Sequence, residues 1–377
     1  MENDRTTTAP SRLRAGFVGA GFMAEVHSRA ARAAGAEIAG IASSSPSSAA
    51  RAKDRLGAEQ AYASVQDLIQ DDGIDVIHVC TPNATHVAFA EAALKAGKHV
   101  VCEKPLATNV QDATHLVELA ATARTVATVP FVYRFHPMVR EAQARIASGQ
   151  TGRISTIQGS YLQDWLLSRN DDNWRVDAGL GGPSRAFADI GSHLCDLLEF
   201  VSGDRIIRVG ALSRTLFSGR AKHKDVQTED LVAAVFATEN GTVGSLLVSQ
   251  VAPGRKNRLM IEISGSESTV QFDQESPETL WLGKRAGSQL LVRDPGALSP
   301  EAARLSVLPA GHPQGYQDAF NAFVADTYAA IDGELRAGLP TFRDGLRSAV
   351  LTESIVESSK CGEWVDVPGV NQLEGVQ

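Results

Sequence analysis

The sequence contains little cysteine and no long apolar run. Its four cysteines, Cys80, Cys102, Cys195 and Cys361, lie far apart and form no C-x-x-C pair, a pattern that indicates neither a disulfide framework nor a zinc site. Polar residues or glycine interrupt every apolar stretch before it reaches the roughly 18 to 20 residues that span a bilayer. We therefore expect a protein of the reducing cytoplasm with neither a membrane span nor a metal site.

Basic residues are also in the minority. Lysine and arginine number 36 against 44 aspartate and glutamate residues, which gives a net charge of −8 at pH 7. A surface of this sign does not attract phosphate backbones or anionic membranes, so neither nucleic acid nor a membrane is an expected partner. With 43% hydrophobic and 21% charged residues the composition is that of an ordinary globular protein, and 377 residues predict two domains.

Residues 13–136 alternate short apolar runs with Ala-rich, helix-like segments. This alternation predicts an α/β domain in which crossover helices connect the strands of a parallel sheet. The expected buried strands are residues 13–18, 37–42, 76–80, 99–102 and 126–131. Residues 1–12, which are rich in hydroxyl and acidic side chains, are expected to form a disordered tail.

From residue 137 to residue 377 the pattern changes. A helix over 137–148 is followed by strand-like segments that have no crossover helices between them, and such a series predicts a large open, mostly antiparallel sheet. The expected strands are residues 154–163, 206–213, 231–237, 244–251, 258–264 and 269–272, with helical spacing returning over 316–336 and 345–359. We expect this second domain to bind substrate. We also expect it to self-associate, because an exposed sheet face needs covering.

A glycine-rich turn follows the first expected strand. It reads Gly19-Ala20-Gly21-Phe22-Met23-Ala24 and lies between a strand and a helix-like stretch, which is the context of a dinucleotide fingerprint. Gly19 allows the tight turn, Gly21 lets the backbone approach a pyrophosphate, and Ala24 permits close helix packing. The six residues alone are weak evidence, because a glycine turn also occurs without a ligand, but the alternating strands around them favour a cofactor site.

The end of the second expected strand bears on which cofactor binds there. The acidic residue that usually contacts the ribose 2′-hydroxyl is missing, because the strand runs into Ser43-Ser44-Ser45. Serines can donate hydrogen bonds to a hydroxyl or to a phosphate. No arginine follows the strand directly, so we expect NAD, and NADP is not excluded.

Two motifs after later strands carry a family resemblance. Thr81-Pro82-Asn83 with His86, and then Glu103-Lys104-Pro105, closely resemble the Gfo/Idh/MocA oxidoreductases, and the resemblance continues through residues 133–137, 173–175 and 189–193. It implies a Rossmann domain, a second domain with an open sheet, a nicotinamide cofactor, sugar or polyol substrates and oligomers formed through the sheet face. The expected cofactor-binding residues are Gly19, Gly21, Phe22, Met23, Ala24, Ser43, Thr81, Pro82, Asn83, His86, Glu103 and Lys104.

The resemblance implies three catalytic residues, Lys104, Asp189 and His193. Lys104 follows a parallel strand at its carboxyl end, where open α/β sheets gather ligands. Asp189, His193 and Asp196 are spaced i, i+4, i+7, which predicts one stripe of a helix. A histidine suits removal of a hydroxyl proton as hydride leaves the same carbon. The alternatives to a catalytic role are a solvated helix face and a buried histidine that only makes a hydrogen bond.

Aromatic and cationic residues suggest the substrate. Aromatic faces pack on sugar C–H surfaces, and the run Tyr161-Leu162-Gln163-Asp164-Trp165 is similar to that of family members such as levoglucosan dehydrogenase, which oxidise a pyranoside at C3. The expected substrate-binding residues are Tyr133, Arg134, Tyr161, Gln163, Asp164, Trp165, Trp174, Arg175 and His312, the last in a loop expected to close over substrate. An anionic glycoside is a further hypothesis, since arginine suits sulfonate or phosphate. It rests on Arg134, Arg169, Arg175, Arg185, Lys222 and Lys224.

Several functions fit these residues. The first is an NAD-dependent sugar dehydrogenase. The second is a redox-neutral, NAD-dependent glycosidase resembling sulfoquinovosidases, which begins with the same oxidation and returns the hydride after elimination and water addition. An NADP-dependent polyol or inositol-type dehydrogenase and a non-catalytic dinucleotide sensor are the alternatives. Nothing in the sequence separates the first two decisively.

Overall fold

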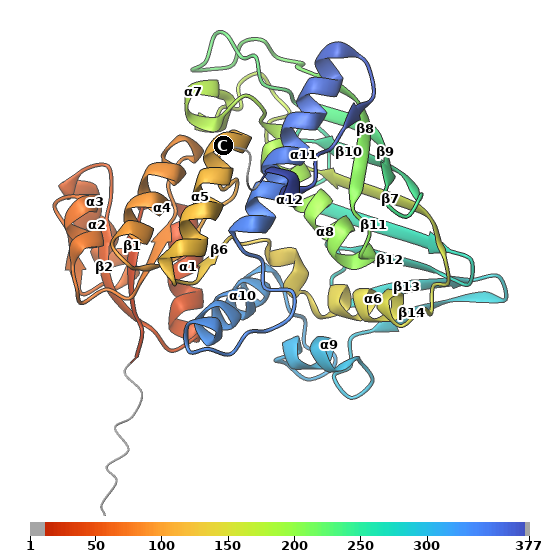
Figure 1. The fold of residues 1–377 in the computed structure, drawn as a ribbon, viewed down its shortest axis with the longest axis horizontal. Helices are drawn as coiled ribbons and strands as arrows, with labels where there is room; N and C mark the ends of the chain where they lie inside the picture. The colour runs from red at the N-terminus through yellow and green to blue at the C-terminus, as the bar shows by residue number, and fades with distance from the viewer. Residues whose placement is uncertain (1–11, 374–377) are drawn as a thin grey trace, which may run out of the picture.

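The computed structural model describes residues 12–373 and shows two packed domains (Figure 1). The first has a six-stranded parallel sheet in the order β3-β2-β1-β4-β5-β6, which is the order of a doubly wound dinucleotide-binding sheet. Its strands are β1 (Arg14–Val18), β2 (Glu37–Ala42), β3 (Gln60–Ala61), β4 (Val76–Val79), β5 (His99–Cys102) and β6 (Ala127–Thr128). The predicted fold of this domain is confirmed. Apart from Arg12, the expected tail lies outside the described residues.

Helices cover both faces of this sheet, and local sequence sets their ends. Ser45 accepts a hydrogen bond from the Ser48 backbone N–H at 3.2 Å, and Asn109 accepts one from Asp112 at 2.8 Å, so each caps the helix that follows. The helices are α1 (Phe22–Ala33), α2 (Pro46–Leu56), α3 (Val65–Gln70), α4 (His86–Lys95) and α5 (Val110–Ala123), with short turns η1 (Asn83–Thr85) and η2 (Val132–Phe135).

The second domain is built on a nine-stranded sheet in the order β14-β13-β12-β11-β7-β10-β9-β8-β15. Its neighbours pair antiparallel except β7 and β10, which are parallel, so the predicted mostly antiparallel sheet is confirmed. The strands are β7 (Ile154–Leu162), β8 (Ile206–Arg214), β9 (Leu231–Thr238), β10 (Val243–Ser249), β11 (Arg258–Gly265), β12 (Thr269–Asp273), β13 (Thr279–Lys284), β14 (Gly287–Val292) and β15 (Val365–Asp366).

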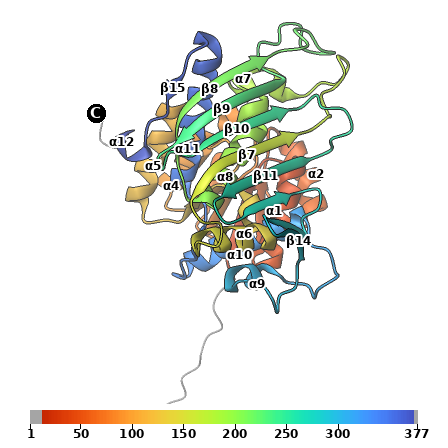
Figure 2. The same cartoon turned by 90° about the vertical axis from the view of Figure 1, so that its right-hand side faces the viewer.

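One face of the large sheet is covered by helices and the other is open, as Figure 2 shows. Helices α6 (Pro137–Ala147), α8 (Ser192–Ser202) and α11 (Phe342–Cys361) pack against it. Along β9 the side chains alternate, with Val232 and Phe236 buried and Val235 48% exposed, because successive residues of a strand face opposite sides. The remaining elements are η3 (Trp174–Val176), α7 (Ala178–Gly181), the π-helical turn η4 (Phe187–Gly191), α9 (Pro300–Leu305), α10 (Tyr316–Ile331) and α12 (Val370–Leu373).

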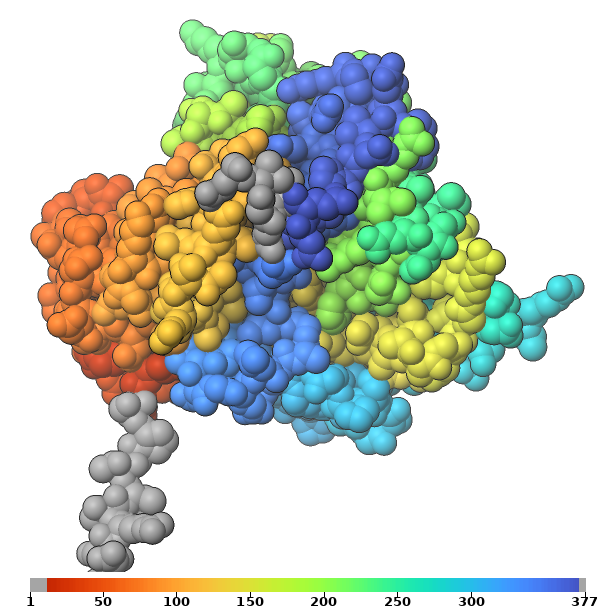
Figure 3. Space-filling view, viewed as in Figure 1, coloured from red at the N-terminus to blue at the C-terminus, as the bar shows by residue number. Residues whose placement is uncertain are grey.

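Helix α10 comes late in the chain but packs against the first domain. Its Phe320 and Phe323 are fully buried in one cluster with Phe17 of β1 and Ala24 of α1. In the space-filling view the C-terminal helices fill the junction between the two domains (Figure 3). The chain therefore ties the two domains together at their shared boundary.

Three simple features of the described residues bear on the chemistry. None of their helices is both long and apolar enough to cross a membrane. All four cysteines are unpaired, and Cys361 is exposed while the others are buried. Residues 12–373 contain no group of three or more His, Cys, Asp or Glu side chains that could hold a metal ion.

Candidate active site

The glycine turn between β1 and α1 fits a dinucleotide. Gly19 has φ 112°, and a Cβ there would lie 2.5 Å from the Cys80 carbonyl oxygen, so only glycine is accommodated. A Cβ on Gly21 would meet nothing within 4 Å, which leaves open space above the backbone at the start of α1. Backbone N–H groups at a helix N-terminus attract phosphate. The residues therefore fit the pyrophosphate of a dinucleotide.

Side chains next to this turn organise its rim. The Ser43 hydroxyl donates a hydrogen bond to Ser48 at 3.1 Å. Arg55 of α2, which the sequence analysis did not select, donates to the Ala20 carbonyl and pairs with Glu25 at 3.0 Å. A half-exposed cation thus stands at the edge of the turn although no arginine directly follows β2.

Other expected cofactor residues brace the loops behind the turn. The buried His86 ring bridges two loops, with Nδ1 2.7 Å from the Pro105 carbonyl and Nε2 2.8 Å from the Thr81 carbonyl. The Asn83 amide donates to the Gly181 carbonyl at 2.8 Å. Pro82 forms the N-cap of η1. These contacts hold the ends of β4 and β5 in a fixed relation.

Lys104 and Asp189 meet across the two domains. Lys104 follows β5, and its Nζ donates to Asp189 Oδ1 and to the Asp189 carbonyl, both at 2.8 Å. The Gln250 amide donates to Asp189 Oδ2 at 2.9 Å, and Arg175 Nε lies 3.3 Å from Oδ1. Burial alone would raise the pKa of Asp189, but the charges of Lys104 and Arg175 outweigh it and hold the pKa well below its ordinary value. Asp189 is therefore ionised and fixed.

His193 lies in the first turn of α8, beside this pair. Its ring packs edge-on against Phe131 and Tyr133, and its Nδ1 is buried without a hydrogen-bond partner. Burial, reinforced by the positive charge of Lys104, lowers the pKa of His193 to about 3. The imidazole is therefore neutral throughout the working pH range and can accept a proton.

The expected single stripe of three residues is interrupted at Asp189. Residues 187–191 form a π-helical turn, so the 100° spacing of an α-helix does not run from Asp189 to His193. His193 and Asp196 both lie on α8, but Asp196 does not line the site. Asp196 instead pairs with Arg134, which also contacts Asp344 at 2.7 Å. Arg134 is buried behind the site, and the two carboxylates compensate the charge of its buried guanidinium. It does not line the cavity, contrary to the expected substrate contact.

A cavity of about 310 Å³ unites the reacting groups. It lies between the start of α1 and the carboxyl end of β5 on one side and the large sheet on the other, which is where open α/β sheets bind ligands. Its lining residues are Phe22, Met23, Glu103, Lys104, Pro130, Tyr133, Tyr161, Gln163, Arg175, Asp189, Ile190, His193, Asn257 and Tyr316.

A polar network that the sequence analysis missed forms one wall. Asn257, the residue before β11, accepts hydrogen bonds from Tyr161 at 2.8 Å and from Gln163 at 2.7 Å, and it donates one to the Tyr133 hydroxyl at 3.2 Å. The Tyr133 and Tyr161 hydroxyls are 2.5 Å apart. No motif marks Asn257 in the sequence, because strand pairing brings it to the site from a distant segment. Tyr316 ends the loop over residues 312–316 that was expected to close over substrate, but His312 was the residue selected from that loop.

Four other expected substrate residues lie outside the cavity. Asp164 pairs with Lys256 at 2.7 Å. Trp165 packs beside Leu166, although its indole N–H reaches Gln163 at 2.8 Å. Trp174 stacks under the Arg175 guanidinium at 4.5 Å. The His312 side chain is exposed, and Arg293 donates a hydrogen bond to the His312 carbonyl at 2.6 Å, so His312 does not contact the cavity in this structure.

The six cations on which the hypothesis of an anionic substrate rests do not gather at the cavity. Arg185 is fully buried against Asp230, and Arg169 donates to the Gly219 carbonyl at 3.2 Å. Lys222 and Lys224 do not line the cavity. Of the six cations named from the sequence, Arg175 alone faces it. The structure therefore reduces the cationic evidence for an anionic substrate to one side chain.

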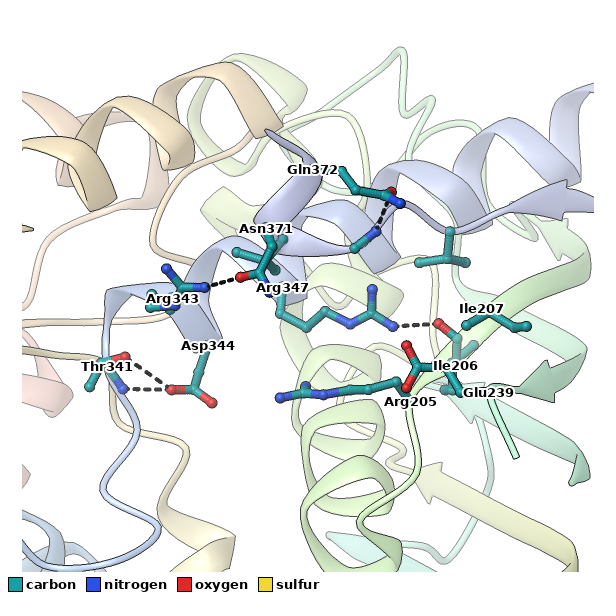
Figure 4. Close-up of a pocket in the computed structure, with 13 residues that line it drawn as sticks. Arg205, Ile206, Ile207, Glu239, Thr341, Arg343, Asp344, Arg347, Asn371 and Gln372 are labelled. Carbon is teal, nitrogen blue, oxygen red and sulfur yellow. Dashed lines mark hydrogen bonds between the residues drawn. The ribbon is translucent and has the colours of Figure 1, made fainter. Parts of the chain in front are cut away.

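A larger cavity of about 540 Å³ lies near the C-terminal helix (Figure 4). Its arginines have protein partners, since Arg347 donates to the Ile206 carbonyl, Arg343 to Asn371 at 2.5 Å and Arg205 to Glu199 at 2.6 Å. None of the residues expected to bind the cofactor or to react lines this cavity. The candidate active site is therefore the smaller cavity between the domains.

Comparison with known proteins identifies the family of the chain. Residues 13–131 match the oxidoreductase family with an NAD-binding Rossmann fold, and residues 139–271 match the GFO/IDH/MocA C-terminal domain. Levoglucosan dehydrogenase of Pseudarthrobacter phenanthrenivorans is 31% identical, covering 95% of this chain and 99% of that protein. Glucose-6-phosphate 3-dehydrogenase of Bacillus subtilis is 24% identical, covering 94% and 99%.

Solved structures give the same result. A levoglucosan dehydrogenase complex with NADH and L-sorbose superposes with a TM-score of 0.89 at 31% identity, covering 95% of this chain and 99% of that chain. An inositol dehydrogenase homologue of Azotobacter vinelandii with NAD⁺ gives 0.87 at 29% identity, covering 95% and 98%. The chain belongs to the Gfo/Idh/MocA family of oxidoreductases, with an NAD-binding Rossmann domain.

Proposed function

We propose that the protein oxidises a pyranoside at a ring carbon, C3, with NAD as hydride acceptor. The observation that carries the proposal is the juxtaposition of Lys104, ionised Asp189 and neutral His193 in one cavity with the residues that follow the glycine turn. Relatives named for levoglucosan and for position 3 of glucose-6-phosphate support a ring sugar. The cavity volume of about 310 Å³ suits a monosaccharide rather than a long chain.

In this reaction His193 takes the hydroxyl proton while the hydride leaves the same carbon and the C–O bond becomes a carbonyl. NAD supplies the acceptor for the hydride when it is bound. A base with a low pKa suffices, because the hydroxyl becomes strongly acidic as the hydride departs. Burial keeps the His193 imidazole neutral before the reaction, so it is able to accept the proton.

Lys104 and Asp189 set the charge around the reacting oxygen. The Lys104 ammonium can donate a hydrogen bond to the substrate oxygen and stabilise negative charge on it. Asp189 holds that ammonium at 2.8 Å and stabilises the imidazolium that forms on His193. Gln250 and Arg175 fix the carboxylate in place, so the groups are arranged before substrate arrives.

A second candidate is a redox-neutral glycosidase of the sulfoquinovosidase type. Arg175 favours it, because a partly exposed guanidinium in the cavity suits a sulfonate or phosphate. The cycle would oxidise C3, remove the C2 proton, expel the aglycone, add water and return the hydride. Burial raises the pKa of both Tyr133 and Tyr161, so these phenols are hydrogen-bond donors and a different group would remove the C2 proton.

One preparation separates the two candidates. The supernatant of denatured protein is assayed for NAD and NADP, and native protein is incubated with neutral and sulfonated aryl glycosides without added cofactor. We expect NADH to form only when a sugar and NAD are both supplied, and the Lys104→Ala and His193→Ala variants to fold but turn over slowly. Aglycone release with bound NAD and no net NADH would establish the glycosidase. Tight NAD binding without turnover of any sugar would instead support a non-catalytic dinucleotide sensor.

We also propose that the chain self-associates through the open face of the large sheet. Apolar side chains are exposed on this face, and a contiguous exposed apolar patch marks a protein–protein interface. They include Leu212, Val235, Val243 and Leu247. Light scattering should give a mass above that of one chain, and Val235→Lys should lower it, whereas a monomeric wild type would contradict the proposal.

A further inference from the structure

A row of four buried side chains crosses the first domain and ends at the active-site cavity. It begins at Tyr328 of α10, passes through His78 in the middle of β4 and His27 on α1, and reaches Glu103 after β5. The Tyr328 hydroxyl lies 2.8 Å from His78 Nε2, His78 Nδ1 lies 2.9 Å from His27 Nδ1, and His27 Nε2 lies 3.0 Å from Glu103 Oε1. The proposed reaction uses none of the first three groups.

The hydrogen atoms of this row follow from its partners. Burial, with a contribution from His27, lowers the pKa of His78 well below its ordinary value, so His78 is neutral and carries one ring hydrogen. That hydrogen lies either on the nitrogen facing His27 or on the one facing Tyr328. In the first case His27 accepts at Nδ1 and carries its hydrogen on Nε2, which donates to the Glu103 carboxylate. In the second case His27 donates from Nδ1 to His78, and a hydrogen on Nε2 as well makes it an imidazolium paired with that carboxylate. Opposite an ionised Glu103, both cases direct an N–H of His27 at the carboxylate.

Glu103 stays ionised in this setting. Burial would raise its pKa, but the hydrogen bond and charge of His27 and the charge of Lys104 together lower it. Its other oxygen accepts the Lys104 backbone N–H at 3.0 Å. The carboxylate is thus fixed on both oxygens, by a side chain from α1 and by the backbone of the catalytic lysine.

The charges in the cavity give this carboxylate a role. Of the two acids that line the cavity, Asp189 is paired with Lys104 and Arg175, whereas the contacts of Glu103 within residues 12–373 are to His27 and to backbone. Any ring that receives hydride must share the 310 Å³ cavity with Lys104 and His193, and so with Glu103. The oxidised nicotinamide ring is positively charged, and it becomes neutral when it accepts the hydride.

We propose that His27, His78 and Tyr328 are positioning residues that hold the Glu103 carboxylate at the cofactor side of the cavity, where it favours binding of NAD⁺ over NADH. This inference rests on the proposed function, because it requires that NAD binds at this cavity. The positioning row lies entirely within the folded core. His27 and His78 have no exposed surface and Tyr328 is only 4% exposed, so solvent does not compete for their hydrogen bonds.

The test measures binding of each dinucleotide to enzyme from which cofactor has been removed. NADH is titrated by its fluorescence, and NAD⁺ by competition against NADH, for wild type, Glu103→Gln, His27→Met and His27→Gln. We expect Glu103→Gln and His27→Met to weaken NAD⁺ by about tenfold relative to NADH, the order expected for loss of one nearby charge in a partly screened site. His27→Gln keeps a side-chain N–H for Glu103 and should restore the wild-type ratio.

A merely structural role gives a different result. Equal weakening of both dinucleotides in folded Glu103→Gln and His27→Met, with the ratio of the two dissociation constants unchanged, overturns the inference. If His27→Met does not fold, Glu103→Gln decides alone, because it removes the carboxylate charge itself. A shift of the ratio toward NADH in this variant then supports the inference, and an unchanged ratio overturns it. Wild-type enzyme that binds neither dinucleotide would overturn the proposed function and this inference with it.

Discussion

The low pKa of His193 predicts that this residue makes the protein sensitive to acid. In the unfolded chain a histidine titrates near its ordinary pKa of about 6.5, whereas in the folded protein burial and Lys104 lower the pKa of His193 to about 3. Below pH 6.5 the unfolded state therefore binds a proton that the folded state does not. The free energy of unfolding therefore decreases as the pH is lowered from about 6.5 to about 3.

The magnitude follows from the two pKa values. Between pH 7 and pH 5 the unfolded histidine becomes almost fully protonated while folded His193 stays neutral. Integrating the difference in bound protons gives a loss of about 2 kcal/mol in the free energy of unfolding from this one side chain. Other groups titrate over the same range, so the measurement compares the protein with a variant that lacks only His193.

The assay is urea unfolding of wild type and His193→Gln at pH 7, 6 and 5, without NAD, because a bound ligand would add its own stabilisation. Wild type should lose about 2 kcal/mol more than the variant between pH 7 and pH 5. An equal loss in both proteins would refute the reasoning, since it would mean that folded His193 is protonated at pH 5. An acid limb near pH 6.5 in kcat/KM that is assigned to His193 would contradict it independently.

Three further outcomes are expected. Lys104→Met should lower kcat by about 10²-fold or more in a protein that still folds, with a lower melting temperature because Asp189 loses an ion-pair partner, and near-normal turnover would remove Lys104 from the chemistry. Gly19→Ala should destabilise the fold by more than about 1 kcal/mol, because its Cβ would lie 2.5 Å from the Cys80 carbonyl oxygen, whereas Gly21→Ala should fold normally and bind NAD more weakly; equal melting temperatures would contradict the first and unchanged affinity the second. Asn257→Leu should raise the KM for sugar more than it lowers kcat, and steady-state kinetics with both parameters unchanged would exclude Asn257 from substrate binding.

The fold could be predicted where each segment carries its own signal. The central parallel strands are apolar on both faces, so β1, β2, β4 and β5 were expected near their observed bounds. Strand β13 and the edge strand β14 beside it were missed. Most residues of β14 are exposed, and without a buried face a strand has no alternating pattern to detect.

For the candidate site too, some residues could be predicted from the sequence and others could not. Lys104 and His193 were expected from motifs, and the structure places both at one cavity. Arg134 and Arg185 were expected near substrate, but each is buried against aspartate. Sequence spacing could not predict this, because the carboxylates that pair with them, such as Asp230, come from distant segments.

The sequence by itself determined the NAD-binding sheet, the glycine turn and the strand-end position of the catalytic lysine, because each depends on residues close together in the chain. Only the tertiary structure decided which charges face the cavity and which histidines stay neutral. It also joined Tyr328 to Glu103 through two histidines, across more than two hundred residues of sequence. Burial, desolvation and charge pairing depend on neighbours that folding brings together, and no local pattern records them.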